Sequence, residues 1–189
     1  MDRRTVKTKK AIKHALIQLM TEKDVSKITV KELAETADIS RKTFYVHYGQ
    51  FIDVLSEIDD DIFNRLHAEL AEEKWNEGRP DFSVLFKHLN NIIQEDEQFF
   101  KLLVGSSYCN TLSAHIQKLL EEEIASALQD NITVAPELFA LSIEYISAGA
   151  TSLIIEWLRS DSKVTAEEVT DCIAGIMSNG FYAYINSQA

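Results

Sequence analysis

The sequence predicts an all-α protein, an assignment that rests on hydrophobic spacing and on clearly marked helix starts. Apolar side chains recur every three to four residues in successive segments of the 189-residue chain, as expected for helices with a buried face. Thr29 with Glu32, and Thr165 with Glu168, have the spacing of a capping box, which satisfies free backbone N–H groups at a helix start. A break containing Gly and Pro at residues 76–80 is the clearest linker.

Composition places the chain among soluble globular proteins. With 46% hydrophobic and 26% charged residues, it can bury one sizeable core or two modest ones. The longest apolar run, residues 145–155, is too short to span a bilayer, and residues 2–10 are polar and basic, unlike a signal-peptide core. Cys109 and Cys172 lie far apart and outside any metal-binding or redox pattern, which favours a reducing compartment and a place in the core. We therefore expect a cytoplasmic protein without a membrane segment.

The net charge of -11 is distributed unevenly along the chain. Residues 1–50 hold 11 Lys and Arg against 6 Asp and Glu, whereas residues 51–189 hold 8 against 24. A basic first quarter is typical of a surface that meets phosphates, and an acidic remainder is typical of a solvated body that avoids them. The charge pattern thus indicates two parts, residues 1–50 and residues 51–189, with a nucleic-acid partner for the first.

The first expected helix covers residues 5–22, with Ile12, Leu16 and Leu19 on its apolar face. Four lysines crowd its polar side: Lys7, Lys9, Lys10 and Lys13. These lysines would either lie along phosphates or form an ordinary solvated face, and the sequence fits both interpretations equally.

A second helix is expected to begin after Thr29, the N-cap of the capping box, and to turn Leu33, Ala34 and Ala37 toward the core. The turn that follows contains Asp38, at a position that needs a left-handed backbone. Glycine adopts that conformation freely and Asp tolerates it better than most other residues.

A third helix is expected to begin after Ser40, another typical N-cap residue. At 100° per residue, Phe44 and Tyr48 point to the core side of this helix, which leaves its polar face free. So short a helix is unstable alone and must be held by its neighbours. Two short helices joined by a tight turn, the second with an exposed polar face, form the layout of a DNA-reading helix-turn-helix.

The pattern T-x-x-E-L-A-x-x-A-x-x-S-x-x-T-F-Y-x-H-Y, which starts at Thr29, resembles the amino-terminal domain of the TetR/AcrR family of transcriptional regulators. The resemblance covers roughly residues 5–55. It implies an all-helical homodimer in which a three-helix DNA-binding domain, residues 1–50, precedes a helical domain, residues 51–189, that binds a small effector and dimerises. Gln50 and Phe51 stand where the family usually has Ser or Asn followed by a phosphate-binding Lys, so that anchor is missing.

The resemblance also implies roles for individual residues. Thr43 and Tyr45 match positions that meet bases and backbone, His47 matches a phosphate contact, and Lys31 matches a groove-facing cation. From side-chain chemistry, Lys42, Thr43 and Lys31 would read bases and Val46 would touch a thymine methyl group, with Tyr48 among the residues that position the backbone. The full set expected to contact double-stranded operator DNA is Thr29, Lys31, Ser40, Arg41, Lys42, Thr43, Tyr45, Val46, His47 and Tyr48.

The second part shows no sign of catalysis or of a cofactor or metal site. The chain lacks a G-x-S-x-G motif and a Gly-rich phosphate loop. Its histidines at 67, 88 and 115 have no ligand spacing and are expected to be surface or hydrogen-bonded residues. Asp59, Asp60 and Asp61, in a long helix expected from residue 51 to about 75, point in different directions and are expected to be solvated.

Pro136 opens a helix that is apolar on every side, with only Glu144 and Glu156 charged between residues 138 and 158. One face would pack on the core of its own chain and another would need a partner chain. With a last helix that begins near Thr165, it would form a two-fold four-helix bundle in a homodimer. The expected dimer residues are Tyr145, Ala148, Gly149, Ser152, Ile176 and Phe181.

The tract GATSLIIEWLRSDSKVTAEEV is similar to the carboxy-terminal domain of regulators of dihydroxyacetone kinase operons. Four aromatic residues are candidates for an effector pocket, although each of them would also suit an ordinary core: Phe63, Phe86, Tyr108 and Trp157. Three hypotheses follow: a repressor released by a small-molecule effector, a regulator or activator controlled by a protein partner, and an enzyme or scaffold with an incidental helix-turn-helix. The operator and the effector are not encoded in any recognisable motif.

Overall fold

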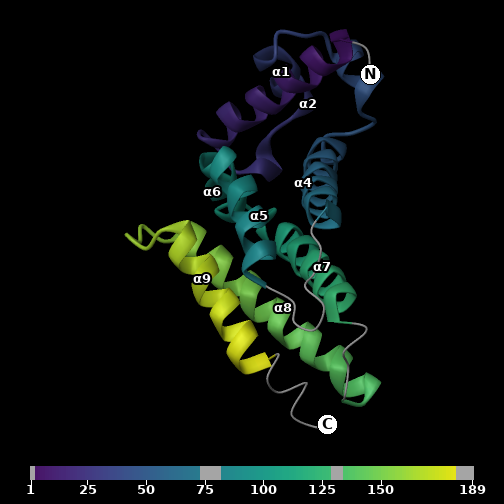
Figure 1. The fold of residues 1–189 in the computed structure, drawn as a ribbon. Helices are drawn as coiled ribbons and strands as arrows, with labels where there is room; N and C mark the ends of the chain where they lie inside the picture. The colour runs from purple at the N-terminus through teal and green to yellow at the C-terminus, as the bar shows by residue number, and fades with distance from the viewer. Residues whose placement is uncertain (1–2, 73–81, 129–133, 182–189) are drawn as a thin grey trace.

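The computed structural model describes residues 3–72, 82–128 and 134–181, which form helices and no strand (Figure 1). The expected all-α fold is confirmed. The helices in chain order are α1 (Arg3–Met20), the short 3₁₀ helix η1 (Val25–Lys27), α2 (Val30–Thr36), α3 (Arg41–His47), α4 (Ile52–Glu72), α5 (Phe82–Glu95), α6 (Glu97–Val104), α7 (Cys109–Leu128), α8 (Pro136–Arg159), α9 (Ala166–Ile176) and the π-helical turn η3 (Met177–Phe181). The linker expected at residues 76–80 lies outside the described residues.

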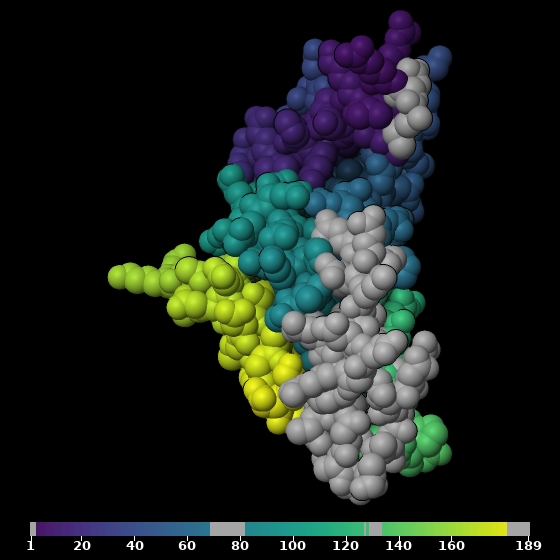
Figure 2. Space-filling model, viewed as in Figure 1, coloured from purple at the N-terminus to yellow at the C-terminus, as the bar shows by residue number. Residues whose placement is uncertain are grey.

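The first three α-helices pack together at one end of an elongated molecule (Figures 1 and 2). We call α1, η1, α2 and α3 the head, and α4 to α9 the body. Ile12 and Leu16 of α1, Leu33 of α2 and Phe44 of α3 are fully buried and belong to the hydrophobic core. A seven-residue helix such as α3 is marginal in isolation, so this packing is what holds it in place.

The turn between α2 and α3 closes as a Schellman motif. The Asp38 N–H donates to the Glu35 carbonyl at 3.2 Å, and the Ile39 N–H donates to the Ala34 carbonyl at 3.0 Å. Asp38 has φ of 53°, the left-handed backbone expected from its position. Both helix starts also agree with the sequence, because Thr29 caps α2 in a capping box and Ser40 caps α3.

The body is a layered arrangement of long helices in which α8 packs on α7 and α9 packs on α5 (Figure 1). α4 joins the head to this body and contacts both α5 and α7. Pro136 is at the first turn of α8, and Thr165 and Glu168 form the capping box of α9, as the sequence predicts. The loop between α8 and α9 projects from the surface (Figure 2).

α8 buries one face and exposes another. Ile143, Ala150 and Ile154 are buried in the core, whereas Leu141 and Tyr145 are 62% and 80% exposed. In the part of the chain that the structure describes, α8 is the one helix long and apolar enough to cross a membrane by length and composition alone. Its buried face shows that α8 is a core helix of the body. Core helices of soluble proteins can meet the same criteria of length and apolar composition.

The left-handed backbone at Asp38 gives a stability prediction. Asp38→Gly should raise the free energy of unfolding by about 1 kcal/mol, because glycine has no Cβ to clash in this conformation. Asp38→Ala is the matched control and should lower it, since alanine cannot form the local hydrogen bonds that help Asp. Urea denaturation of the three proteins would measure both effects, and a loss of stability in Asp38→Gly would contradict the assigned turn.

Candidate nucleic-acid interface and ligand cavity

The side chains of α3 separate into a buried face and an exposed face. Phe44 is fully buried and its ring centroid lies 5.5 Å from that of Tyr48, which is buried as well. On the other side, Tyr45 and Val46 are 56% and 73% exposed, unusual values for such apolar side chains. Arg41 and Lys42 are also exposed. This face therefore presents two cations, an aromatic ring and a branched aliphatic group on a rigid helix.

The start of α3 is fixed by the pair Ser40 and Thr43. The Ser40 hydroxyl accepts a hydrogen bond from the Thr43 N–H at 3.0 Å, and the two hydroxyl oxygens are 2.8 Å apart. Each hydroxyl retains further hydrogen-bonding capacity, and both bonds are solvent-exposed. His47, in the last turn, is half-buried. The pair thus orients the threonine before any ligand arrives.

Tyr48 does not lie with the other expected contact residues. It is four positions after Phe44 and shares its face of the helix, so its ring packs inside the molecule. The Lys9 ammonium group lies 5.5 Å from the ring centroid, and the phenol hydroxyl bonds with Glu57 of α4. Burial, followed by the nearby Glu57 carboxylate, raises the pKa of the Tyr48 hydroxyl. Tyr48 therefore links the head to the body.

α2 contributes one exposed cation beside α3. Lys31 is solvent-exposed, with only a 4.0 Å ion pair to Glu35 one turn later. The Thr29 hydroxyl, by contrast, donates to the Glu32 carboxylate at 2.8 Å and accepts the Glu32 N–H at 3.2 Å. Thr29 stabilises the helix start, and its hydroxyl is already occupied in the capping box.

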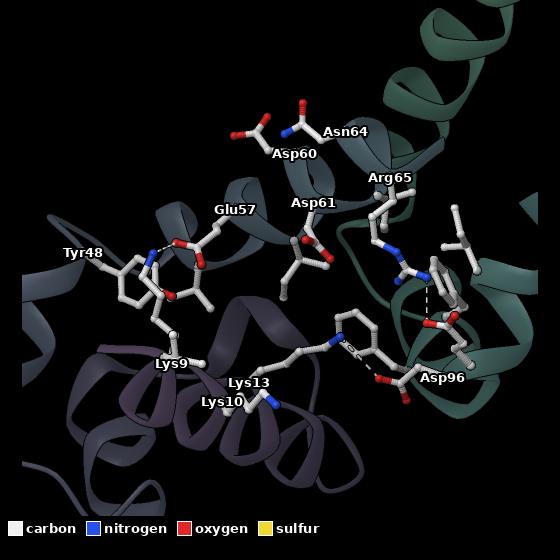
Figure 3. A pocket seen from close by; sticks show the side chains of 18 residues that line it. Lys9, Lys10, Lys13, Tyr48, Glu57, Asp60, Asp61, Asn64, Arg65 and Asp96 are labelled. Atoms are coloured by element: carbon white, nitrogen blue, oxygen red, sulfur yellow. Dashed lines mark hydrogen bonds and ion pairs between the residues drawn. The ribbon is translucent and has the colours of Figure 1, made fainter. Parts of the chain in front are cut away.

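Two lysines of α1 face the body and contact it directly (Figure 3). Lys9 pairs with Glu57 of α4, and Lys13 lies 3.4 Å from Asp96 at the start of α6. The Lys13 ammonium group also lies 5.1 Å from the centre of the Phe99 ring. These contacts line a groove of about 830 Å³ between head and body. Lys9 and Lys13 are therefore ion-paired with the body, which differs from both interpretations of the sequence, phosphate contact and simple solvation.

A second link joins the loop after α1 to the turn before α7. The Asp24 carboxylate accepts hydrogen bonds from the Ser107 N–H at 2.8 Å and from the Ser107 hydroxyl at 2.7 Å. It also accepts the N–H and hydroxyl of Ser26 in its own loop. The Ser26 and Ser107 hydroxyls, together with their N–H groups, hold the pKa of Asp24 well below its usual range. The Asp24 carboxylate thus links the head to the body through hydrogen bonds.

A cavity of about 540 Å³ lies between α4, α5, α7 and α8 of the body. Of the four aromatic residues expected to form a pocket, Phe63 lines it. Phe86 is fully buried in the core, and the Trp157 indole N–H donates to the Val164 carbonyl at 2.8 Å in the projecting loop. The Tyr108 hydroxyl donates to Asp59, a residue of the cavity wall, at 2.5 Å. These three have hydrogen-bonding or packing roles beside the cavity.

Asp59 is the residue of this cavity that the sequence reasoning missed. The expectation that it is solvated was wrong, because its side chain is only 9% exposed. Its Oδ2 accepts the Tyr108 hydroxyl and lies 2.6 Å from His115 Nδ1. The available signal was its spacing, since residue 59 lies on the apolar stripe that contains Leu55, Ile62 and Leu66.

Two histidines of the body pair with carboxylates. His115 bonds with Asp59, and His67 Nδ1 lies 2.9 Å from Glu123 of α7. In residues 3–72, 82–128 and 134–181, the structure contains no cluster of three His, Cys, Asp or Glu side chains that could hold a metal ion. Cys109 is buried as expected, whereas Cys172 is exposed on α9.

Most of the residues expected at a dimer interface are exposed. Tyr145, Gly149 and Ser152 are exposed on α8, and Ile176 is 54% exposed on α9. Ala148 is half-buried, and the side chain of Phe181 lies outside the described part of the chain. Leu138 and Leu141, two further residues of α8, are exposed as well.

An exposed polar face on a short helix held by two others defines the molecule as an all-helical helix-turn-helix protein. The family model described as "Transcriptional regulator C-terminal region", from the TetR series, matches residues 81–179, more than half of the 189-residue chain. The chain therefore belongs to the TetR family of transcriptional regulators. The resemblance seen in the helix-turn-helix sequence is confirmed, and so is the expectation that the protein is a regulator and not an enzyme.

Solved structures of the same family share the fold over nearly the whole chain. A TetR transcriptional regulator from Streptococcus agalactiae 2603V is 25% identical with a TM-score of 0.68, and the match covers 94% of this chain and 97% of that one. The dihydroxyacetone kinase operon activator DhaS is 18% identical with a TM-score of 0.66, over 94% and 96% of the two chains. The second likeness extends to the fold of the body, the part in which the sequence resembles such regulators.

A curated relative, the uncharacterized HTH-type transcriptional regulator YxbF of Bacillus subtilis (strain 168), is 20% identical over 190 residues. The match covers 94% of this chain but 47% of YxbF, so the chain spans about half the length of the curated relative it matches.

The capping box of α2 gives a pH prediction. A hydrogen bond from Lys23, followed by those from Thr29, lowers the pKa of Glu32 from 4.5 to about 2. Because the folded pKa is depressed, Glu32 stabilises the head fully above pH 4.5, and this contribution is lost as the pH falls toward 2. NMR titration of the Glu32 carboxyl should show the low value.

Unfolding experiments give an independent check of the same residue. Between pH 4.5 and 2, Glu32→Gln should lose less stability than the natural chain, since it has no carboxylate to protonate in this range. Glu22→Gln, in the turn after α1 and outside the capping box, is the matched control. An unshifted Glu32 titration would contradict the hydrogen-bonded geometry.

Proposed function

We propose that the protein is a repressor that binds a palindromic double-stranded operator as a homodimer and is released by a small-molecule effector. The observation that carries the DNA-binding part is the exposed face of α3, where Arg41, Lys42, Tyr45 and Val46 lie opposite the fully buried Phe44. A basic head in front of an acidic body directs phosphates to that face and away from the rest of the chain.

Within this proposal, the contacts divide by chemistry. Lys42 and Lys31 donate to the acceptor-rich edge of guanine, and Thr43 bonds with a neighbouring base edge. The isopropyl group of Val46, 73% exposed, touches a thymine methyl. The backbone contacts come from Arg41, Ser40, Tyr45 and His47, which fix the register of the helix in the groove. Thr29 supports α2 through its capping box.

The dimer is proposed from the uncovered surface of α8 and α9. Three large hydrophobic side chains of these helices are each more than half exposed: Leu141, Tyr145 and Ile176. Their exposure to water is unfavourable, and contact with a second copy of the chain would bury them. Two copies of α8 and α9 that pack around a two-fold axis would bury these residues in a four-helix bundle. The symmetry places the two α3 helices in successive major grooves, about 34–36 Å apart.

The effector is proposed to bind the body cavity of about 540 Å³, a size suited to a small organic molecule. Among proteins of similar fold, the Thermus thermophilus FadR structure, a repressor in complex with lauroyl-CoA, is 15% identical with a TM-score of 0.57 over 91% of this chain and 94% of that one. That structure supports a ligand-responsive body by analogy of fold alone.

The route from cavity to head is short in this chain. Asp59 on the cavity wall accepts the Tyr108 hydroxyl, and Ser107, the preceding residue, donates twice to Asp24 of the head. A ligand that moves the start of α7 therefore acts directly on a bond that holds the head. A coupling of about 1–3 kcal/mol between effector and operator is the usual range for such a link.

A second candidate is a regulator, including an activator, that answers to a protein partner. The observation in its favour is the same uncovered face of α8, which a partner helix would cover as well as a second copy does. The similar fold of the operon activator DhaS supports this alternative to the same limited degree. The oligomeric state of the purified protein distinguishes the two candidates, because the effector-released repressor requires a homodimer in the absence of any partner protein.

The DNA-reading face is tested by the double substitution Lys42→Ala with Tyr45→Ala. Affinity for an operator obtained by binding-site selection should fall about tenfold or more, because a good base contact contributes about 1–3 kcal/mol. Fluorescence anisotropy at one fixed salt concentration measures the change. Lys163→Ala, an exposed lysine of the loop after α8, is the matched control and should bind like the natural chain. Equal affinity of all three proteins would exclude α3 as the reading element.

The dimer surface is tested by Leu141→Glu with Tyr145→Glu. Two carboxylates per chain on the two-fold face should leave a monomer of 21.4 kDa in sedimentation velocity, whereas the natural chain sediments as a dimer. Ser162→Glu, in the exposed loop after α8, controls for added charge and should remain dimeric. A natural chain that is monomeric at micromolar concentration would contradict the homodimer and favour the protein partner.

A further inference from the structure

The cavity of the body is apolar along most of its wall and carries three acidic side chains. Ile62, Phe63, Leu89, Leu112 and Ile154 supply aliphatic and aromatic surface. Among the charged side chains of this wall, Asp59 is the most deeply buried, at 9% exposed. A cavity of this kind accepts a ligand with an apolar body and selects it by the chemistry of a single polar group.

The carboxylate of Asp59 is only half satisfied. Its Oδ2 is bonded to Tyr108 and His115, but its Oδ1 is buried and has no hydrogen-bond partner in the described part of the chain. A buried carboxylate oxygen without a donor is unfavourable relative to a satisfied one. An entering donor that reached this oxygen would therefore bind more tightly than its own contact area implies.

The charges around Asp59 select the sign of that donor. Asp60 and Glu122 also line the cavity, and Lys118, the one lysine of its described lining, lies 3.8 Å from Glu122. His115 is already bonded to Asp59 itself. A cation is thus attracted to this end of the cavity, whereas a carboxylate or phosphate would meet like charge with no free lysine or arginine in the described lining.

We infer that the cavity takes amphiphilic amines, molecules with an apolar body and one ammonium group that bonds with Asp59. This inference rests on the proposed effector function and names the chemical class of the effector. A charged donor of this kind forms a short, charge-assisted hydrogen bond with the carboxylate, which a neutral alcohol of the same shape forms only weakly.

An ammonium group bonded to Oδ1 would also draw the Asp59 carboxylate toward the ligand. Its Oδ2 accepts the Tyr108 hydroxyl at 2.5 Å, and Tyr108 belongs to the turn that carries Ser107. A shift of Tyr108 with this carboxylate would disturb the two bonds from Ser107 to Asp24 in the head. Asp59 would thus select the ligand and also transmit its binding to the head, which releases the operator.

Three matched probes test the inference with the full chain: 4-phenylbutylammonium, 4-phenylbutan-1-ol and 4-phenylbutanoate. Isothermal titration calorimetry at neutral pH should give an affinity for the ammonium probe about tenfold or more above that for the alcohol, and least for the carboxylate. Asp59→Asn should remove the difference between ammonium and alcohol. Asp61→Asn, an exposed neighbour on α4, should retain it and is the matched control.

The inference is overturned if the alcohol or the carboxylate binds the natural chain as tightly as the ammonium probe, if Asp59→Asn retains the preference, or if none of the three binds at millimolar concentration. The ranking in the natural chain decides the matter even if Asp59→Asn fails to fold. Operator binding without any probe is measured alongside. Loss of the ranking with intact operator binding would overturn the ligand class alone, whereas an intact ranking without operator binding would overturn the proposed function alone.

Discussion

The face that α3 presents to DNA depends on the burial of one side chain, Phe44. The helix that carries it has seven residues, too few to persist in water alone, so its conformation comes from the core that it shares with α1 and α2. Full burial of a phenylalanine contributes about 1.5–3 kcal/mol, and its position fixes which residues of α3 point outward. The caps at Thr29 and Ser40 and the left-handed turn at Asp38 then set the angle between the two helices.

The interactions between the head and the body are weaker than those that hold the helices of the head together. Besides the covalent path through α4, the described links include two partly exposed ion pairs from Lys9 and Lys13, the contact of Tyr48 with Glu57, and the hydrogen bonds from Ser107 to Asp24. Ion pairs at such exposure contribute about 0–1 kcal/mol each. Links of this size are of the same order as a typical coupling between effector and operator, so a ligand in the body has enough binding energy to change them.

Local chemistry explains which features the sequence could predict. The starts of α2, α3, α8 and α9 follow from short-range signals at Thr29, Ser40, Pro136 and Thr165, and the structure agrees with each of them. Contacts between residues far apart in the chain could not be predicted from the sequence. No feature of the sequence near Lys9 predicts its pairing with Glu57, 48 residues later. Asp59 is not distinguished from its two acidic neighbours by local sequence, because its partners are Tyr108 in the turn before α7 and His115 in α7. For Tyr48, helical spacing predicted the core side and side-chain chemistry predicted a contact with the DNA backbone; the structure agrees with the spacing, because the ring is buried. The set of dimer residues stays a prediction, since a single chain contains no partner.

The most direct test of a two-headed DNA reader is selection from a random library of double-stranded DNA with the full chain. The account predicts an inverted repeat whose half-site centres are about 10–10.5 base pairs apart, because the two-fold axis places one α3 helix in each of two successive major grooves. A further library with about five base pairs inserted between the half-sites should lose binding, since the second helix would then face the wrong side of the duplex. Enrichment of a single half-site, or of no sequence, would contradict a symmetric dimer that reads DNA through α3.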